Sequence, residues 1–310
     1  MNSPFKSSAL DSLGLLRARG ADVVPFLQGQ LSNDIAQLSA GRSLLAGYHN
    51  PQGRTIALLR LIENAPGDIL AILPRELVAP VAARLGKFVL RSKVKLTDES
   101  GAWALHGLSA ESAAAGGGVA VPLPGEVNEV TRSAAALVVR IGKTPLRALV
   151  VQPRDSVSVL AGTEAAGEAL WHAGAVAAAE PQVYAATSEE FVAQMLNLDV
   201  LGAIAFEKGC YTGQEVIARA HYRGRVKRRL QRFVTTAPMV LTAGGGGQLP
   251  DGRTVKVVDA LQRSDGRCEF LGVAGFAAED AEAAATAAPL LHAAERIEAQ
   301  PLPMPYALPR

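Results

Sequence analysis

The stretch EKGCYTGQEVIARAHYRGRVKRR, residues 207–229, stands apart from the rest of the chain. It contains Cys210, one of only two cysteines, followed by a run of Lys and Arg residues. Thr212 begins a capping-box pattern, so we predict a helix that starts at Gly213. Cys210 would precede the N-terminus of this helix, where exposed amides and Lys208 favour a thiolate. A reactive cysteine and a packed structural thiol are both compatible with this pattern.

The basic residues after the helix start also have two interpretations. Arg219 and Arg223 are spaced i, i+4 and would repel each other unless an anion or a carboxylate lies between them. Beyond Gly224 a strand would place Arg225, Lys227 and Arg229 on one face, where paired donors could hold a carboxylate or a phosphate. The alternative is a charged face that is simply solvated.

The composition describes a globular protein. The chain has 310 residues, 49% hydrophobic and 19% charged, which suggests two or three domains with real cores. Its net charge of +2 gives no global attraction to nucleic acid. Two cysteines cannot build a disulfide framework or supply four thiolates to an iron–sulfur cluster, and the five histidines lack zinc-ligand spacing. We therefore expect no metal site, and a reducing compartment.

Neither a signal peptide nor a membrane span is expected. The N-terminus lacks a sustained apolar segment, and no apolar run approaches about 20 residues. We therefore expect a soluble, cytoplasmic protein.

Hydrophobic periodicity in the first hundred residues predicts strands grouped around few helices, which is typical of an α+β fold. Pro80 is expected in the first turn of the second helix. The predicted strands are 13–20, 44–49, 54–63, 67–73 and 92–99, and the predicted helices are 21–35 and 75–90.

In the rest of the chain, short apolar runs separated by glycine-rich turns predict a small C-terminal β-barrel. A capping-box pattern, Thr187 with Glu190, predicts a helix over 187–196. Residues 111–126 are predicted to form a loop. The remaining predictions are strands over 135–142, 147–152, 228–236, 239–243, 254–263 and 268–276, and helices over 162–174 and 277–297.

The segment FVAQMLNLDVLGAIAFEKGCYTGQEVIARAHYRGRVKRRL, residues 191–230, closely resembles the signature region of the YgfZ family. These are folate-binding proteins related in fold to the aminomethyltransferase (T-protein) of the glycine cleavage system. The core of the match is KGCYTGQE, residues 208–215. Supporting motifs occur in the expected order, namely FLQGQLSNDI, YHNPQGR and FVLRSKV. The resemblance spans most of the chain and is weakest over 110–165 and the C-terminal tail.

The resemblance implies a three-domain ring. A discontinuous folate-binding domain would combine residues 1–42 with 108–225, a ferredoxin-like α+β insert would span 43–107, and a C-terminal β-barrel would span 226–310. Tetrahydrofolate or a derivative would bind near the central cavity. The implied role is to support the maturation or repair of iron–sulfur enzymes, including tRNA-thiolating ones, with those enzymes or assembly factors as partners.

The resemblance also implies site residues. Cys210 and Lys208 carry over as the reactive pair, and Trp171 as the pocket aromatic that would stack on a flat ring. From their charge alone, Arg219, Arg223 and Arg228 are candidates to hold the glutamate tail of a folate. The complete set of expected folate-binding residues is Trp171, Asn197, Asp199, Tyr211, Gln214, Arg219, Arg223 and Arg228.

Two alternatives stand beside a folate-dependent accessory protein. A true aminomethyl- or methyltransferase would need a carboxylate near the folate, and Asp199 and Glu215 are the nearest in the motif. T-protein relatives have Asp where this chain has Cys210, so aminomethyl transfer is not required of it. The other alternative is an RNA- or anion-binding protein without catalysis. We expect no direct nucleic-acid binding, because one basic run is not by itself an extended basic surface.

Overall fold

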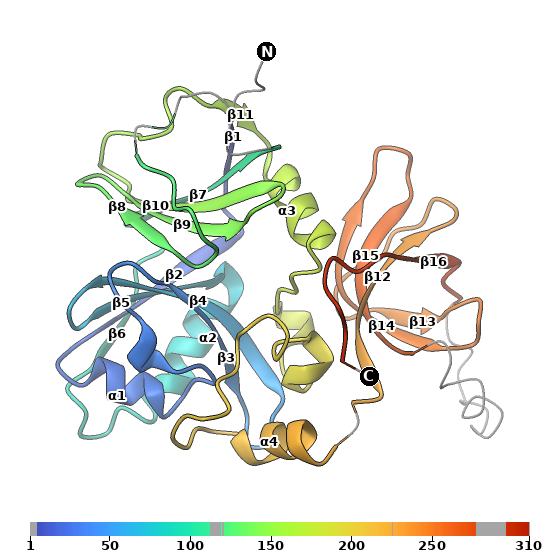
Figure 1. The fold of residues 1–310 in the computed structure, drawn as a ribbon, viewed down its shortest axis with the longest axis horizontal. Coiled ribbons are helices and arrows are strands. Elements are labelled where there is room, and N and C mark those ends of the chain that lie inside the picture. Colours follow the sequence, from blue (N-terminus) through green and yellow to red (C-terminus); the bar gives the residue numbers. More distant parts are fainter. Residues whose placement is uncertain (1–4, 112–118, 120, 225, 277–295, 310) are drawn as a thin grey trace. The chain divides into compact units, whose positions relative to one another are not determined.

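The computed structural model describes residues 5–111, 119, 121–224, 226–276 and 296–309 (Figure 1). The chain forms two compact units, and each has a hydrophobic core of its own. The first unit comprises Met1–Tyr48, Ala57–Gly174 and Ala203–Thr212, and the second comprises His49–Ile56, Ala175–Gly202 and Gly213–Arg310.

A six-stranded sheet in the first unit has the order β11-β1-β7-β10-β9-β8, and only the β1–β11 pair is parallel. Its strands are β1 (Lys6–Ala9), β7 (Trp103–Ala110), β8 (Val130–Arg132), β9 (Leu137–Gly142), β10 (Leu146–Pro153) and β11 (Glu164–Ala166).

Both faces of this sheet are buried, which explains its continuous apolar runs. Side chains alternate between the two faces of a strand. On β10, Leu149 and Val151 face one core, whereas Ala148 and Val150 face another. The helix α3 (Glu168–Ala177) follows β11.

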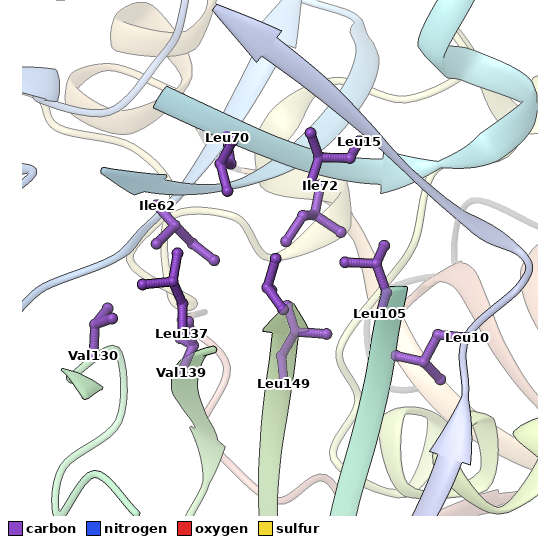
Figure 2. Packing of buried hydrophobic residues seen from close by; sticks show 11 residues of the cluster. Leu10, Leu15, Ile62, Leu70, Ile72, Leu105, Val130, Leu137, Val139 and Leu149 are labelled. Atoms are coloured by element: carbon purple, nitrogen blue, oxygen red, sulfur yellow. The ribbon is translucent and has the colours of Figure 1, made fainter. Parts of the chain in front are cut away.

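A five-stranded sheet, β3-β4-β5-β2-β6, packs against the first of these cores. In Figure 2, Leu15, Ile62, Leu70 and Ile72 of this sheet meet residues such as Leu149 of the six-stranded sheet. The strands are β2 (Leu13–Arg19), β3 (Leu44–His49), β4 (Thr55–Ala65), β5 (Asp68–Pro74) and β6 (Lys95–Asp98), and the helices of this region are α1 (Val23–Gln28), η1 (Ile35–Gln37) and α2 (Arg75–Gly86).

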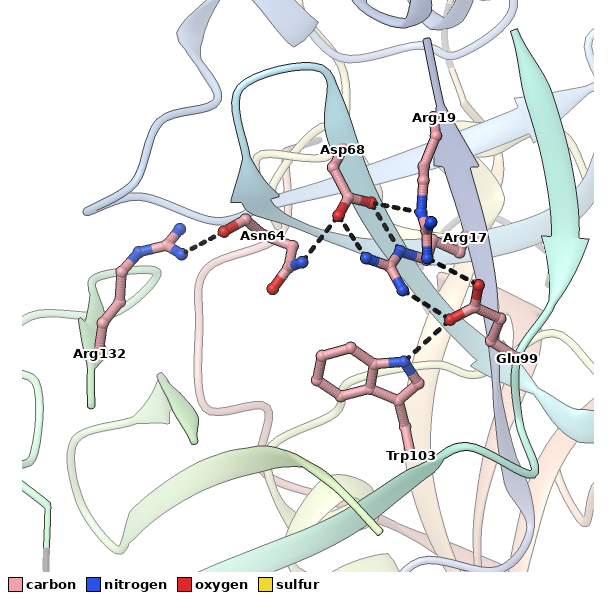
Figure 3. A network of polar contacts seen from close by, with 7 residues as sticks. All are labelled: Arg17, Arg19, Asn64, Asp68, Glu99, Trp103 and Arg132. Atoms are coloured by element: carbon pink, nitrogen blue, oxygen red, sulfur yellow. Dashed lines mark hydrogen bonds and ion pairs between the residues drawn. The ribbon is translucent and has the colours of Figure 1, made fainter. Parts of the chain in front are cut away.

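A polar network lies beside this core (Figure 3). The guanidinium of Arg17 donates to both oxygens of Asp68, at 2.8 and 2.6 Å, and to Glu99 at 2.8 Å. Trp103, from the six-stranded sheet, donates to Glu99 at 3.2 Å. Burial would raise the pKa of Asp68, but hydrogen bonds from Arg17 and Asn64 outweigh it and the pKa lies below its usual value. The network thus links both sheets through charge-assisted hydrogen bonds.

The second unit contains a five-stranded sheet with the order β13-β14-β15-β12-β16. Its core includes Phe233 and Phe270, whose rings stack with their centroids 5.2 Å apart. The strands are β12 (Arg228–Thr235), β13 (Gly246–Gln248), β14 (Thr254–Gln262), β15 (Cys268–Gly275) and β16 (Ala299–Leu302), and this unit also contains η2 (Ala185–Thr187), η3 (Ala193–Leu196) and α4 (Gln214–Tyr222).

The predicted α+β class is confirmed, but several elements differ from prediction. Pro80 lies inside α2 rather than in its first turn. The buried stripe of Leu77, Val81 and Leu85 keeps the helix in place although proline removes one hydrogen bond. The first predicted helix is shorter, because α1 ends at Gln28 before a glycine.

The predicted helix over 187–196 is wrong. Glu189 has a φ of 64°, which interrupts any helix, so the chain forms the 3-10 turns η2 and η3 instead. Residues 239–243 form no strand. The predicted helix over 277–297 falls almost entirely outside the described residues, and the boundaries of the three predicted domains remain predictions.

Candidate functional site

Lys208 forms hydrogen bonds to the last residue of α1 and to the segment that follows this helix. Its Nζ donates to the main-chain carbonyls of Gln28 at 2.7 Å, Leu31 at 2.6 Å and Asn33 at 2.7 Å. An ammonium group has three N–H donors, so these carbonyls use all of them. The contact joins the start of KGCYTGQE to FLQGQLSNDI, motifs about 180 residues apart in the sequence.

Burial controls the electrostatics of this contact. It lowers the pKa of Lys208 to about 8, against the opposing effect of the Asp34 carboxylate. The ring centroid of Tyr211 lies 5.1 Å from Nζ, within the range of a cation–π interaction. Burial also raises the pKa of Tyr211 to about 12, so its hydroxyl is neutral at physiological pH. Lys208 and Tyr211, both predicted site residues, are therefore neighbours.

Cys210 lies between these two residues and is exposed. The other cysteine, Cys268, belongs to the core of the C-terminal sheet, and burial raises its pKa. Both are free thiols. A thiol must reach its reaction partner to react, and of these two thiols only that of Cys210 is accessible, whereas Cys268 is a packing residue.

The helix after the cysteine begins as predicted, but without the predicted cap. α4 starts at Gln214 with Gly213 as its N-cap residue, and no side chain caps it. Gly213 has a φ of 82°, and a Cβ there would lie 2.5 Å from the Asn50 carbonyl oxygen. Close approach to the turn of residues 50–53, together with the positive φ, therefore requires glycine.

In the second unit, Asn197 and Asp199 lie beside Arg229, which we predicted on the basic strand face but not among the folate-binding residues. Arg229 donates to the two carboxylate oxygens of Asp199 at 2.9 and 2.8 Å, and to the Gln194 carbonyl oxygen at 3.1 Å. Asn197 donates to the Leu230 carbonyl oxygen at 3.0 Å. The side chains of Arg229 and Asp199 are only 4% and 10% exposed.

Arg228, the predicted ligand, is committed elsewhere. It donates to the carbonyl oxygen of Thr254 at 2.9 Å and to its hydroxyl at 3.0 Å. Successive residues of a strand face opposite sides, so only one of Arg228 and Arg229 can face Asp199. The sequence predicted the alternation of side chains along the strand, but it did not predict which face of the strand meets the carboxylate of Asp199.

A cavity of about 240 Å³ adjoins Arg229. Among the described residues, Gln194 Oε1 and Arg229 Nε are buried without a hydrogen-bond partner. Both atoms have almost no accessible surface, so they lie behind the wall of the cavity. Its lining residues are Gln194, Asp199, Ala220, His221, Gly224, Val226, Arg229 and Pro309.

Trp171 is half-buried on α3, in the first unit. Its ring lies against Gly107, where a Cβ would come within 2.3 Å of the ring. The guanidinium carbon of Arg147 is 5.3 Å from the ring centroid. A glycine below the ring and a cation beside it hold the indole against β7, at the edge of the core that the two sheets share.

The other predicted residues lie on or beside α4. Gln214 is its first residue, and Arg219 pairs with Glu215 at 3.0 Å rather than with an anion. Arg223 is exposed at the C-cap. Among the described residues, no group of three or more His, Cys, Asp or Glu could hold a metal ion. In the same part of the chain, no helix is both long and apolar enough to cross a membrane.

Comparison with known proteins identifies the family, although no family model matches the chain. The chain is 33% identical over 277 residues to the tRNA-modifying protein YgfZ of Escherichia coli, covering 85% of this chain and 83% of that protein. The protein of the same name from Shigella sonnei is 32% identical over the same shares. The glycine cleavage system aminomethyltransferase T from Bartonella henselae superposes with a TM-score of 0.67 at 14% identity, over 88% of this chain and 79% of that one. The chain therefore belongs to the YgfZ family and has the fold of the T-protein.

Proposed function

We propose that this protein binds tetrahydrofolate or a derivative and supports iron–sulfur enzymes of tRNA modification in the cytoplasm, with Cys210 as its reactive thiol. The observation that carries the proposal is an exposed cysteine two residues from Lys208, whose ammonium is anchored by three carbonyls. The name of the YgfZ relatives supports the link to tRNA modification. The family resemblance supports the folate.

Cys210 would act by thiol–disulfide exchange. Its thiolate attacks one sulfur of a partner's disulfide, forms a mixed disulfide, and releases the other partner sulfur as a thiolate. A single accessible thiol suits this chemistry and cannot hold a cluster alone. Lys208 positions the cysteine segment, because its three N–H groups are already used.

The chemistry of the described residues fits a pterin. A cavity of about 240 Å³ is smaller than the roughly 300–1,000 Å³ of drug-sized ligand sites, so it suits one ring system rather than a whole folate. The side chains of Gln194 and Asp199 in its lining carry donor and acceptor groups of the kind that a pterin ring edge would pair with. We infer that Asp199, in the lining of this cavity, contributes to pterin binding.

An anaerobic calorimetric titration with tetrahydrofolate tests the proposal. Wild type and Cys210→Ala should bind alike, because the thiol acts after binding. Asp199→Asn should weaken binding about tenfold through the loss of a charge-assisted hydrogen bond. Asp265→Asn is the control, because Asp265 pairs with the nearby Arg267 in an exposed turn away from the cavity lining. If neither wild type nor the control binds tetrahydrofolate, the folate assignment is wrong.

The thiol chemistry needs its own experiment. Wild-type protein should form a mixed disulfide with an oxidised small-molecule disulfide, and mass spectrometry should locate the adduct at Cys210. Cys210→Ser should give no adduct, whereas Cys268→Ser should react like wild type. An adduct at Cys268 alone would overturn the assignment.

A further inference from the structure

The motif FVLRSKV has no role in the site described above. It lies in the loop between α2 and β6, residues 87–94, which we call the basic loop. Residues 84–95, RLGKFVLRSKVK, include five Lys or Arg residues and no Asp or Glu. The whole chain carries a net charge of only +2, so this concentration of positive charge is local.

Apolar side chains accompany these charges on the surface. Phe88 is 48% exposed and Leu90 is 88% exposed. Leu90 also has a φ of 38°, a conformation uncommon for residues other than glycine. With Arg91 and Ser92, these two residues line an open hollow of about 700 Å³. An exposed apolar hollow ringed by charge is typical of an interaction surface.

The cations of the basic loop differ from other surface cations in their ion pairing with the described residues. Lys87, Arg91 and Lys93 form no ion pair with any other residue that the structure describes. By comparison, Arg219 and Arg267, also on the surface, each pair with a nearby carboxylate. Within the described part of the chain, the loop therefore offers three cations without an ion pair, of which Arg91 lines the apolar hollow.

Hydrogen bonds connect the basic loop to the cysteine segment through α1. The main-chain N–H of Lys93 donates to the Asp22 carboxylate at 2.7 Å, just before α1 begins. The last residue of α1, Gln28, supplies one of the carbonyls that bind Lys208. Six helical residues extend about 9 Å, so one short helix separates the loop from the anchor of the Cys210 segment.

We propose that the basic loop docks a protein partner through a segment whose apolar side chain enters the hollow and whose flanking Asp or Glu residues meet Lys87, Arg91 and Lys93. The inference rests on the proposed function, because docking here presents the partner to Cys210. Charge complementarity selects an acidic surface. Of the two apolar side chains in the hollow, the aliphatic Leu90 is more exposed than Phe88 (88% against 48%), and it gains from burial against protein but offers no π-face to a nucleic-acid base.

The experiment measures binding of the full-length protein to a purified tRNA-thiolating iron–sulfur enzyme, the partner class of the proposed function. Leu90→Asp and Arg91→Glu should each weaken binding at least tenfold. Val157→Asp is the matched control and should bind like wild type, because Val157 is 84% exposed in the same unit. Higher salt should weaken wild-type binding more than binding of Arg91→Glu.

Equal affinity of all four proteins would overturn the inference, as would failure of wild type to bind the enzyme. So would a result in which the two loop variants lose affinity only for single-stranded RNA or for vesicles of anionic lipid. Tetrahydrofolate titration of the same variants separates the two proposals. If the two loop variants bind tetrahydrofolate like wild type but bind the enzyme more weakly, the result supports docking. If wild type itself does not bind tetrahydrofolate, the result counts against the proposed function alone.

Discussion

Lys208 is a charged residue whose ammonium group is bound by three main-chain carbonyl oxygens. Replacing it with methionine keeps an unbranched side chain, one atom shorter, but leaves the carbonyls of Gln28, Leu31 and Asn33 without their shared donor. We expect Lys208→Met to lower the free energy of unfolding by about 2–3 kcal/mol, the typical cost of losing a charged hydrogen-bonding group. Urea unfolding measures this. Lys87→Met is the control, because Lys87 is exposed, and equal losses in both variants would contradict the assignment.

His49 gives a prediction about pH. It is fully buried, and burial lowers its pKa to about 3. An unfolded histidine takes up a proton near pH 6.5, whereas the folded one stays neutral, so acidification favours the unfolded chain. The free energy of unfolding should therefore fall as the pH drops below about 6.5, with His49 contributing a slope that approaches 1.4 kcal/mol per pH unit.

His49→Gln should remove this part of the slope in urea unfolding between pH 5 and 7. In the wild type, the His49 ring signals should not titrate over the same range in NMR spectra. Parallel slopes for the two proteins, or a titration midpoint near pH 6.5, would contradict the burial argument.

Among the elements, α4 depends on a single glycine at its start. Gly213→Ala would force a side chain at positive φ to within 2.5 Å of the Asn50 carbonyl oxygen. We expect it to lower the free energy of unfolding by about 1–3 kcal/mol, the usual range for local backbone strain. Gly209→Ala is the matched control, because a Cβ there meets no atom within 4 Å. Thermal unfolding of the two variants gives the comparison, and an unaffected Gly213→Ala would rule out the close approach.

At the element scale, hydrophobic periodicity predicted the strands that have buried faces. The strands β2 to β5 and β10 lie where apolar runs place them, because burial on one or both faces leaves a direct pattern in the residues. The turns η2 and η3 were missed, because the capping-box pattern at Thr187 is local, whereas the positive φ of Glu189 is imposed by tertiary structure.

At the scale of the whole molecule, the separate cores predict separate unfolding transitions. Both tryptophans, Trp103 and Trp171, lie in the first unit, so tryptophan fluorescence reports on that unit alone. Phe270→Ala removes a fully buried ring from the core of the second unit and should cost about 3–5 kcal/mol there.

Urea unfolding should then show a fluorescence midpoint that Phe270→Ala leaves in place and a circular dichroism transition that it shifts to lower urea. Leu149→Ala, in the core of the first unit, is the reciprocal control and should shift the fluorescence midpoint. Coincident transitions by both probes in every variant would instead indicate a single cooperative unit.

The site was predictable to the extent that it lies in one ordered motif. Cys210 and Lys208 were predicted from KGCYTGQE, but the carbonyls that bind Lys208 were not, because they lie about 180 residues away and belong to no side chain. Arg229 was predicted on a basic strand face that could hold a carboxylate, but its partner was not predicted. Its importance comes from the carboxylate of Asp199, which only the fold brings within 2.8 Å.

All amino acids carry the main-chain carbonyl, so the three oxygens that bind Lys208 would survive almost any substitution at residues 28, 31 and 33. Substitutions in that segment therefore leave the hydrogen bonds of the ammonium unchanged as long as the path of the backbone is preserved. The lysine has no such freedom, since a shorter or neutral side chain leaves the oxygens without a cation. The contact therefore resembles a crown ether with its guest: the host can change its substituents, whereas the guest cannot be exchanged.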